Sequence, residues 1–164
     1  MIIRDAANGD LQAIVEIYND TILTRLATAV LEPVAGAERA GWLPRHGPDR
    51  RPLWIAEIDG EVPGWLGFEP FYCRPAYRHT AEISVYVARS GAGAGVGASL
   101  LGQALRRRPE LGLSTLLDFG FAHNEASIAL FAGSGFQRWG HLPRVAELDG
   151  LERDPLVLGH RVTD

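Results

Sequence analysis

The sequence is poor in the residues that build disulfides and metal sites. Its 164 residues include one cysteine, Cys73, so an intrachain disulfide and a cysteine-rich zinc site are both excluded. We expect the thiol of this cysteine to be partly buried and unreactive. The five histidines are scattered and lack the HExxH spacing of zinc hydrolases, so we expect no bound metal.

Long hydrophobic runs and concentrated positive charge are absent as well. No apolar run approaches the roughly 20 residues of a membrane span, and Met1–Asp5 becomes polar too early for a secretory signal. The formal net charge is −4, and the densest basic stretch, Arg106–Arg108, suits the C-terminal end of a helix. We therefore expect a cytoplasmic protein that binds neither membranes nor nucleic acid.

The composition is that of an ordinary globular domain. Hydrophobic residues make up 46% of the chain and charged residues 22%, which allows one sizeable core. No internal repeat, low-complexity tract or linker divides the sequence. Residues 1–164 are therefore expected to form a single domain.

Hydrophobic periodicity predicts a mixed α/β sheet flanked by helices. Asp10 can cap a helix that begins at Leu11, and a second helix is predicted over 35–43, ending at Pro44. Asn124 can cap a later helix, which Gly135 closes. An initial strand is followed by predicted strands at Leu53–Ile58, Val62–Phe68, Ala81–Val87, Thr115–Phe121, Phe136–His141 and Leu156–Val162. Pro63 places its strand at an edge or itself among the first residues of that strand.

The most informative segment, Thr80–Leu101, runs from an alternating strand through a glycine-rich turn directly into a helix. Glycines at 91, 93, 95 and 97 allow tight bending and close approach of a ligand, because they lack a Cβ and tolerate positive φ. The following helix offers unpaired N–H groups and the positive end of its dipole. The junction therefore predicts a phosphate-binding site.

Two phosphate ligands compete for this turn. Gly93–Ala98 matches the loose dinucleotide pattern G-x-G-x-x-[GA]. A Rossmann domain would carry that pattern in its first strand–helix unit, whereas here it lies in the middle of the chain. The position therefore favours the alternative ligand, the pyrophosphate of coenzyme A.

The same turn resembles the acetyl-CoA motif of the GCN5-related N-acetyltransferases, Q/R-x-x-G-x-G/A, read here as Ala92–Gly97. The segment from Asn124–Ile128 through Gly135–Phe136 is similar to the second cofactor motif of that family. Further segments resemble the phosphinothricin and methionine sulfoximine N-acetyltransferases over nearly the whole chain, namely Ile17–Asn19, Glu32–Pro33, Arg74–Tyr77, Thr80–Glu82 and Ser84–Val87.

The resemblance implies a homodimeric enzyme that transfers the acetyl group of acetyl-CoA to the α-amino group of a small amino acid. Backbone groups of Val85, Tyr86 and Val87 would hold the pantetheine and thioester, and the Val87 N–H would stabilise the oxyanion. Asn124 and Ser127 would lie near the pantetheine or thiol end. The pyrophosphate would bind the backbone amides of Gly93, Ala94, Gly95, Val96, Gly97 and Ala98.

Glu82 is the predicted catalytic base. An α-amine is mostly protonated below its pKa of ~8, so it needs a base before it attacks a thioester. Strand alternation puts Glu82, Ser84 and Tyr86 on one face of their strand. The residue pattern alone also allows a solvent-facing carboxylate or an ion-pair partner of a nearby arginine.

The resemblance further implies substrate contacts from Arg74, Pro75, Ala76, Glu82, Ile83 and Ser84. A planar guanidinium suits a substrate carboxylate, and Arg78 is a second local donor. Asp118 and Asp149, in contrast, are expected to be structural or solvated.

Three departures from the family pattern bear on function. Ala92 and Ala94 stand where the cofactor motif usually has Gln or a basic residue, so weaker coenzyme A binding is expected. Phe131 stands near the tyrosine that serves many relatives as general acid, which leaves a water or no acid for the departing thiolate. Residues 28–31 lack the aromatic residue of the subgroup, so the preferred amino acid is expected to differ.

Two rival functions stay open. The chain could acetylate another amine, where a peptide N-terminus would demand an open groove and a polyamine would favour acidic pocket walls. Alternatively it could bind an acyl-CoA with little turnover. A pure binder has no need for a carboxylate at Glu82, so that residue separates the two classes.

Overall fold

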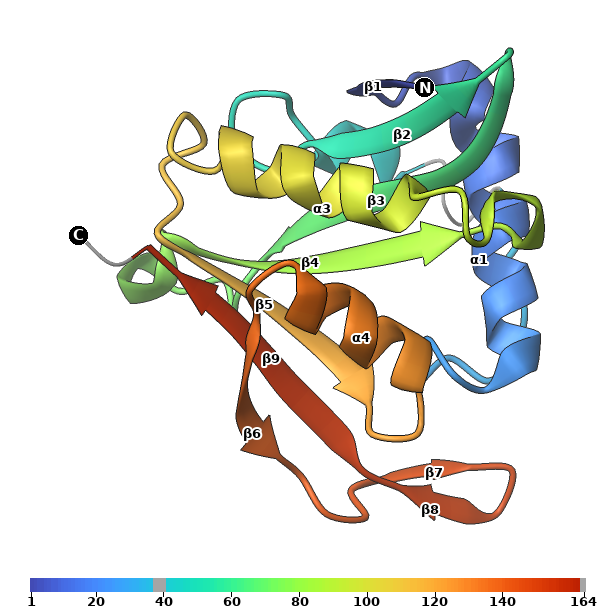
Figure 1. Cartoon of the computed structure of the whole chain (residues 1–164), viewed down its shortest axis with the longest axis vertical. Helices are drawn as coiled ribbons and strands as arrows, with labels where there is room; N and C mark the ends of the chain where they lie inside the picture. The colour runs from blue at the N-terminus through green and yellow to red at the C-terminus, as the bar shows by residue number, and fades with distance from the viewer. Residues whose placement is uncertain (37–40, 163–164) are drawn as a thin grey trace.

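The computed structural model describes residues 1–36 and 41–162, which form a seven-stranded mixed sheet with helices on both faces (Figure 1). The strand order is β1-β2-β3-β4-β5-β9-β6, and a separate hairpin pairs β7 with β8. The strands are β1 (Ile2–Asp5), β2 (Leu53–Ile58), β3 (Glu61–Pro70), β4 (Thr80–Val87), β5 (Thr115–Phe121), β6 (Gln137–His141), β7 (Ala146–Leu148), β8 (Leu151–Arg153) and β9 (Pro155–Arg161). The predicted mixed α/β sheet is confirmed.

The helices cover the two faces of the sheet, and a hydrophobic core layer lies on each face. The main helices are α1 (Leu11–Thr24), α3 (Val96–Arg107) and α4 (Glu125–Gly133), and short 3-10 turns cover Asn8–Asp10, Leu43–Arg45, Pro75–Tyr77 and Arg89–Gly91. α3 and α4 pack on one face of the sheet, where Ile83 and Leu116 are fully buried. α1 covers the opposite face and packs its Ile14 and Ile22 against Trp65. No helix in residues 1–36 and 41–162 is long and apolar enough to cross a membrane.

The sheet is split between β4 and β5, its parallel pair. The ladder between these strands runs from Thr80 and Thr115 only as far as Glu82 and Leu117. Beyond that point the two strands diverge toward their C-terminal ends, as Figure 1 shows for the green and pale orange arrows. Backbone groups of β4 on this side are therefore released from sheet pairing and can bind a ligand.

Asp10 begins α1 in a different way from the predicted N-cap. Its side chain makes no capping hydrogen bond to α1. Instead the Arg4 guanidinium donates to both carboxylate oxygens at 2.8 and 2.9 Å, and the Ala7 N–H donates at 2.7 Å. These bonds hold the pKa of Asp10 below its ordinary value and tie β1 to the start of the helix.

Pro63 lies in a central strand. β3 pairs with both β2 and β4, so the edge position is wrong, and the alternative position among the first residues of the strand is confirmed. The register of β2 against β3 shifts between Ala56 and Ile58, opposite this proline. The irregularity accommodates a residue that has no N–H to donate.

The other differences lie in short or irregular segments. The predicted helix over 35–43 includes residues 37–40, which lie outside the described residues, and Pro44 is inside the 3-10 turn Leu43–Arg45. The β7–β8 hairpin was not predicted, since each strand has only three residues. Cys73 is exposed rather than partly buried, because the loop between β3 and β4 runs over the surface.

Candidate active site

A cavity of about 800 Å³ lies at the gap between β4 and β5. Its volume is within the range of small-molecule sites. Residues from both sides of the sheet line it: Thr28 and Tyr86 come from the α1 side, whereas Val96 and Leu130 come from the α3 and α4 side. Because the sheet is split here, residues on both of its faces line one continuous cavity.

The glycine-rich turn forms one end of this cavity. Gly93 and Gly95 have φ values of 75° and 76°, the left-handed region in which glycine is favoured. Gly95 is the N-cap of α3, so the first amides of the helix face the cavity end where the turn lies. A Cβ at Gly97 would come within 2.9 Å of the Leu130 side chain, which would then have to shift. The geometry expected of a phosphate-binding junction is present.

Most predicted cofactor residues line the cavity. They are Val85, Tyr86, Val87, Gly93, Gly95, Val96, Gly97, Ala98, Asn124 and Ser127. Ala94, in contrast, is exposed and is not part of the lining. The Asn124 side chain is engaged at both ends, since its Oδ1 accepts from Ser127 N at 3.1 Å and its Nδ2 donates to Leu26 O at 3.1 Å. Asn124 thus caps α4, as predicted, and also fixes the loop after α1.

Glu82 lines the cavity where the β4–β5 ladder ends. Burial raises its pKa, and the negative charge of Glu69, its partner on β3, raises it further. Glu69 is itself held ionised by its neighbours: Trp42 Nε1 donates to it at 2.9 Å, and His46 Nε2 lies 3.3 Å away. The solvent-facing alternative for Glu82 is therefore wrong, because its carboxyl group is half-buried in a cavity.

Asp118 is a functional candidate that sequence reasoning missed. It follows Leu117, the last β5 residue paired with β4, lines the same cavity as Glu82, and is only 7% exposed. Its Oδ2 has no hydrogen-bond partner among residues 1–36 and 41–162. Burial, with a smaller contribution from Glu82, raises its pKa to about 7. The structural or solvated role expected for Asp118 does not fit these surroundings.

The predicted substrate residues fall into three groups. Glu82 and Ser84 line the cavity. Ile83 points the other way and is fully buried in the core under α3 and α4. Arg74, Pro75 and Ala76 are exposed in the loop between β3 and β4 and do not line the cavity of this chain. No local sequence pattern indicates that this loop lies away from the gap.

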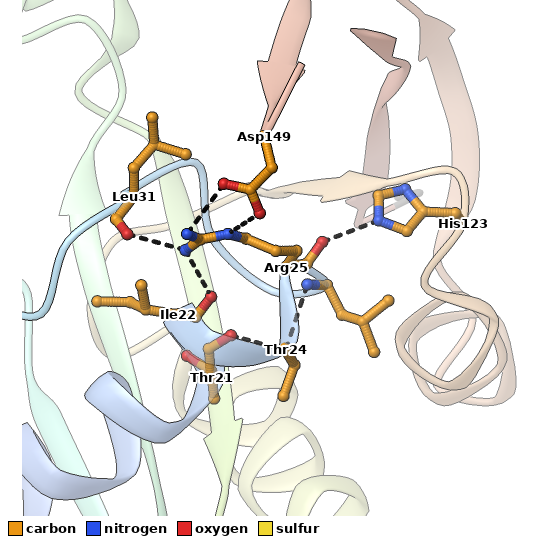
Figure 2. A network of polar contacts seen from close by, with 8 residues as sticks. Thr21, Ile22, Thr24, Arg25, Leu31, His123 and Asp149 are labelled. Carbon is orange, nitrogen blue, oxygen red and sulfur yellow. Dashed lines mark hydrogen bonds and ion pairs between the residues drawn. The ribbon is translucent and has the colours of Figure 1, made fainter. Parts of the chain in front are cut away.

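A polar network holds the cavity wall that follows α1 (Figure 2). Arg25, in the left-handed conformation that ends α1, pairs with Asp149 in the β7–β8 turn through bonds of 2.7 and 3.1 Å. The same guanidinium donates to Ile22 O and Leu31 O, and Arg25 O faces His123 Nε2 at 2.9 Å. Asp149 is thus structural, as expected. The network fixes the wall that carries Ala27, Thr28 and Ala29.

Arg89 also lines the cavity and was not singled out from the sequence. It begins the 3-10 turn Arg89–Gly91, just before the glycine-rich turn. Its guanidinium supplies positive charge near the end of the cavity where Ala92 and Ala94 carry none. The signal was present as a basic residue three positions ahead of the motif.

The fold and this cavity define an acyltransferase architecture, and comparison with known families agrees. Residues 12–136 match the model of the Acetyltransferase (GNAT) family. This match spans more than half of the chain, so the protein belongs to that family and is an acetyltransferase. The resemblance drawn from the glycine turn and the Asn124 segment is confirmed.

Individual relatives agree with this membership. YwnH of Bacillus subtilis (strain 168), a candidate phosphinothricin acetyltransferase, is 45% identical over 99% of this chain and 100% of its own length. An L-methionine sulfoximine/L-methionine sulfone acetyltransferase of Pseudomonas paraeruginosa is 33% identical over 90% and 87%. A phosphinothricin acetyltransferase of Sinorhizobium meliloti, solved in complex with acetyl-CoA, superposes with a TM-score of 0.92 at 28% identity, covering 98% and 88%.

Proposed function

We propose that this protein transfers the acetyl group of acetyl-CoA to the amino group of a small amino acid or analogue of the phosphinothricin or methionine sulfoximine type. One observation carries the proposal: a single cavity joins a helix-capping glycine turn to a half-buried carboxylate, Glu82. The names of the relatives support the acceptor class. The cytoplasmic location, the homodimer and the single domain over 1–164 stay predictions.

The residues that line the cavity fit acetyl-CoA. The turn at Gly93–Ala98 would hold the pyrophosphate, because left-handed glycines and the start of α3 offer N–H groups without side chains in the way. The released edge of β4 at Val85–Val87 would hold the pantetheine by backbone bonds. Arg89 adds the charge that the alanines of the motif lack.

Glu82 is proposed as the catalytic base. It would accept a proton from the amino nitrogen as that nitrogen attacks the thioester carbon, directly or through a water. A carboxyl group with a raised pKa is a stronger base when ionised, so burial suits this task. The C–N bond forms, the C–S bond breaks, and coenzyme A leaves as a thiolate.

A second acceptor class is favoured by one observation. The carboxyl group of Glu82 lines the α1 side of the cavity, while Arg74 lies outside it. Acidic walls suit an amine that bears no carboxylate, such as a polyamine, better than they suit an amino acid. A panel of acceptors that tests this function must therefore include both kinds of amine.

The test measures thiol release from acetyl-CoA by purified protein with methionine sulfoximine, methionine sulfone, phosphinothricin, ordinary amino acids and spermidine. Glu82→Gln should lower kcat by about 100-fold or more and leave acetyl-CoA binding unchanged, because only the base is removed. Glu16→Gln, on the exposed side of α1, is the matched control. Binding of acetyl-CoA without turnover of any acceptor would support the binding-module function instead.

A further inference from the structure

We propose that Asp118 is the general acid that protonates the departing thiolate of coenzyme A, an inference that rests on the proposed acetyl transfer. The reaction needs a proton at sulfur, and Phe131 cannot supply one. Its ring has no acidic proton, is 1% exposed and packs edge-on against Phe136 at a centroid distance of 4.9 Å. A protein group that assists the departure of the thiolate must therefore be another residue on the cofactor side of the gap.

The position of Asp118 meets this requirement. The β4–β5 ladder ends at Glu82 and Leu117, so Asp118 is the first β5 residue where the strands part. Its neighbour Leu116 packs in the core under α3 and α4, and alternation along β5 puts Asp118 on that same side. Glu82 lies on the opposite side of the sheet with Tyr86, which packs near α1. Asp118 thus reaches the cavity from the side proposed for acetyl-CoA, and Glu82 reaches it from the side proposed for the acceptor amine.

The surroundings of Asp118 favour the protonated acid. Oδ2 of Asp118 lies against Gly120, 3.2 Å from the position that a Cβ of residue 120 would occupy. It receives no hydrogen bond within the described part of the chain. Leu158 faces Asp118 from β9, and Glu82 on β4 is the charged group that acts on it. Burial, with neither cation nor donor beside the carboxyl group among residues 1–36 and 41–162, raises its pKa to about 7, so it carries a proton in a large fraction of molecules at neutral pH.

The proton balance of the reaction closes with these two groups. The acceptor arrives as an ammonium ion and first loses one proton to solvent. As the C–N bond forms, Glu82 takes a second proton from nitrogen; as the C–S bond breaks, the electron pair goes to sulfur and the Asp118 O–H proton follows it. Glu82 then holds one proton too many and Asp118 one too few, and exchange with solvent restores both.

The experiment compares the pH dependence of kcat for wild type, Asp118→Asn and Asp118→Glu, with Asp20→Asn on the exposed side of α1 as control. Wild type should lose activity as pH rises above about 7, because the acid must be protonated. Asp118→Asn should lower kcat by about 100-fold, abolish this descending limb and leave acetyl-CoA affinity unchanged. Asp118→Glu should retain the limb and recover part of the rate.

The outcomes separate this inference from the function on which it rests. If wild type releases no thiol with any acceptor, the proposed acetyl transfer fails and the acid role fails with it. If wild type is active and Asp118→Asn has the same kcat and the same pH profile, only the acid role is overturned. Infrared difference spectra of wild type against Asp118→Asn should show a carboxylic acid band that disappears near pH 7; a band lost below about pH 5 would also overturn it.

Discussion

At the residue scale, the buried position of Asp118 lowers the free energy of unfolding at neutral pH. Its pKa rises from 3.8 to about 7 on folding, so the folded state binds this proton more tightly than the unfolded chain does. The raised pKa costs no stability below pH 3.8, where the carboxyl group is protonated in both states, and stability falls as pH rises toward 7. A buried, unpartnered acid that destabilises the fold at neutral pH is more readily explained by function than by structure.

This argument predicts that Asp118→Asn stabilises the protein as it impairs catalysis. The asparagine does not ionise, so its advantage in free energy of unfolding should grow by on the order of 2 kcal/mol between about pH 5 and about pH 8. Urea unfolding of both proteins at the two pH values measures the difference. A constant difference would mean that Asp118 does not titrate with a raised pKa, whereas Asp20→Asn should leave the pH dependence unchanged.

At the element scale, strong local patterns were sufficient to predict helices and strands from the sequence. Features that depend on tertiary arrangement could not be predicted in this way. Short, mostly apolar runs predicted β2 and β5 with their observed bounds, and positive φ at Gly95 follows from the glycine turn. The three-residue strands β7 and β8 are too short to show periodicity. Asp118 looked structural because its role depends on the parting of β4 from β5, which no local pattern encodes.

The contact between α1 and the β7–β8 hairpin supports a prediction about the acceptor side. Asp149→Asn weakens the pair with Arg25, which holds the wall at Ala27–Ala29. The KM for the acceptor should rise by about 3- to 10-fold, while the KM for acetyl-CoA stays the same, since the glycine turn lies elsewhere. The melting temperature should change little, because exposed ion pairs contribute little stability.

Initial rates with each substrate varied in turn measure both constants. Asp154→Asn is the control, since Asp154 pairs with His141 and Arg144 and does not contact the α1 wall. Equal increases in the two KM values would show that Asp149 supports the whole site rather than one wall.

At the scale of the whole molecule, the cavity that crosses the sheet predicts the kinetic mechanism. Donor and acceptor can occupy their own sides of the gap at the same time, so transfer can be direct and needs no acyl-enzyme. Cys73 is exposed in the β3–β4 loop and is not part of the cavity lining. Double-reciprocal plots at several acceptor concentrations should intersect; parallel lines would indicate a ping-pong mechanism and contradict direct transfer.

The network around Arg25 also has a consequence for how acceptor preference can change over time. The wall at Ala27–Ala29 is anchored mainly from outside the cavity, by Asp149, Leu31 O and His123. Of the residues that would hold acetyl-CoA, Asn124 adds one bond, to Leu26 O. Substitutions at Ala27–Ala29 can therefore accumulate while these anchoring contacts stay in place and without changing the glycine turn that would bind acetyl-CoA. The acceptor preference of this fold can therefore change through residues 27–29, while the glycine turn that would hold acetyl-CoA stays the same.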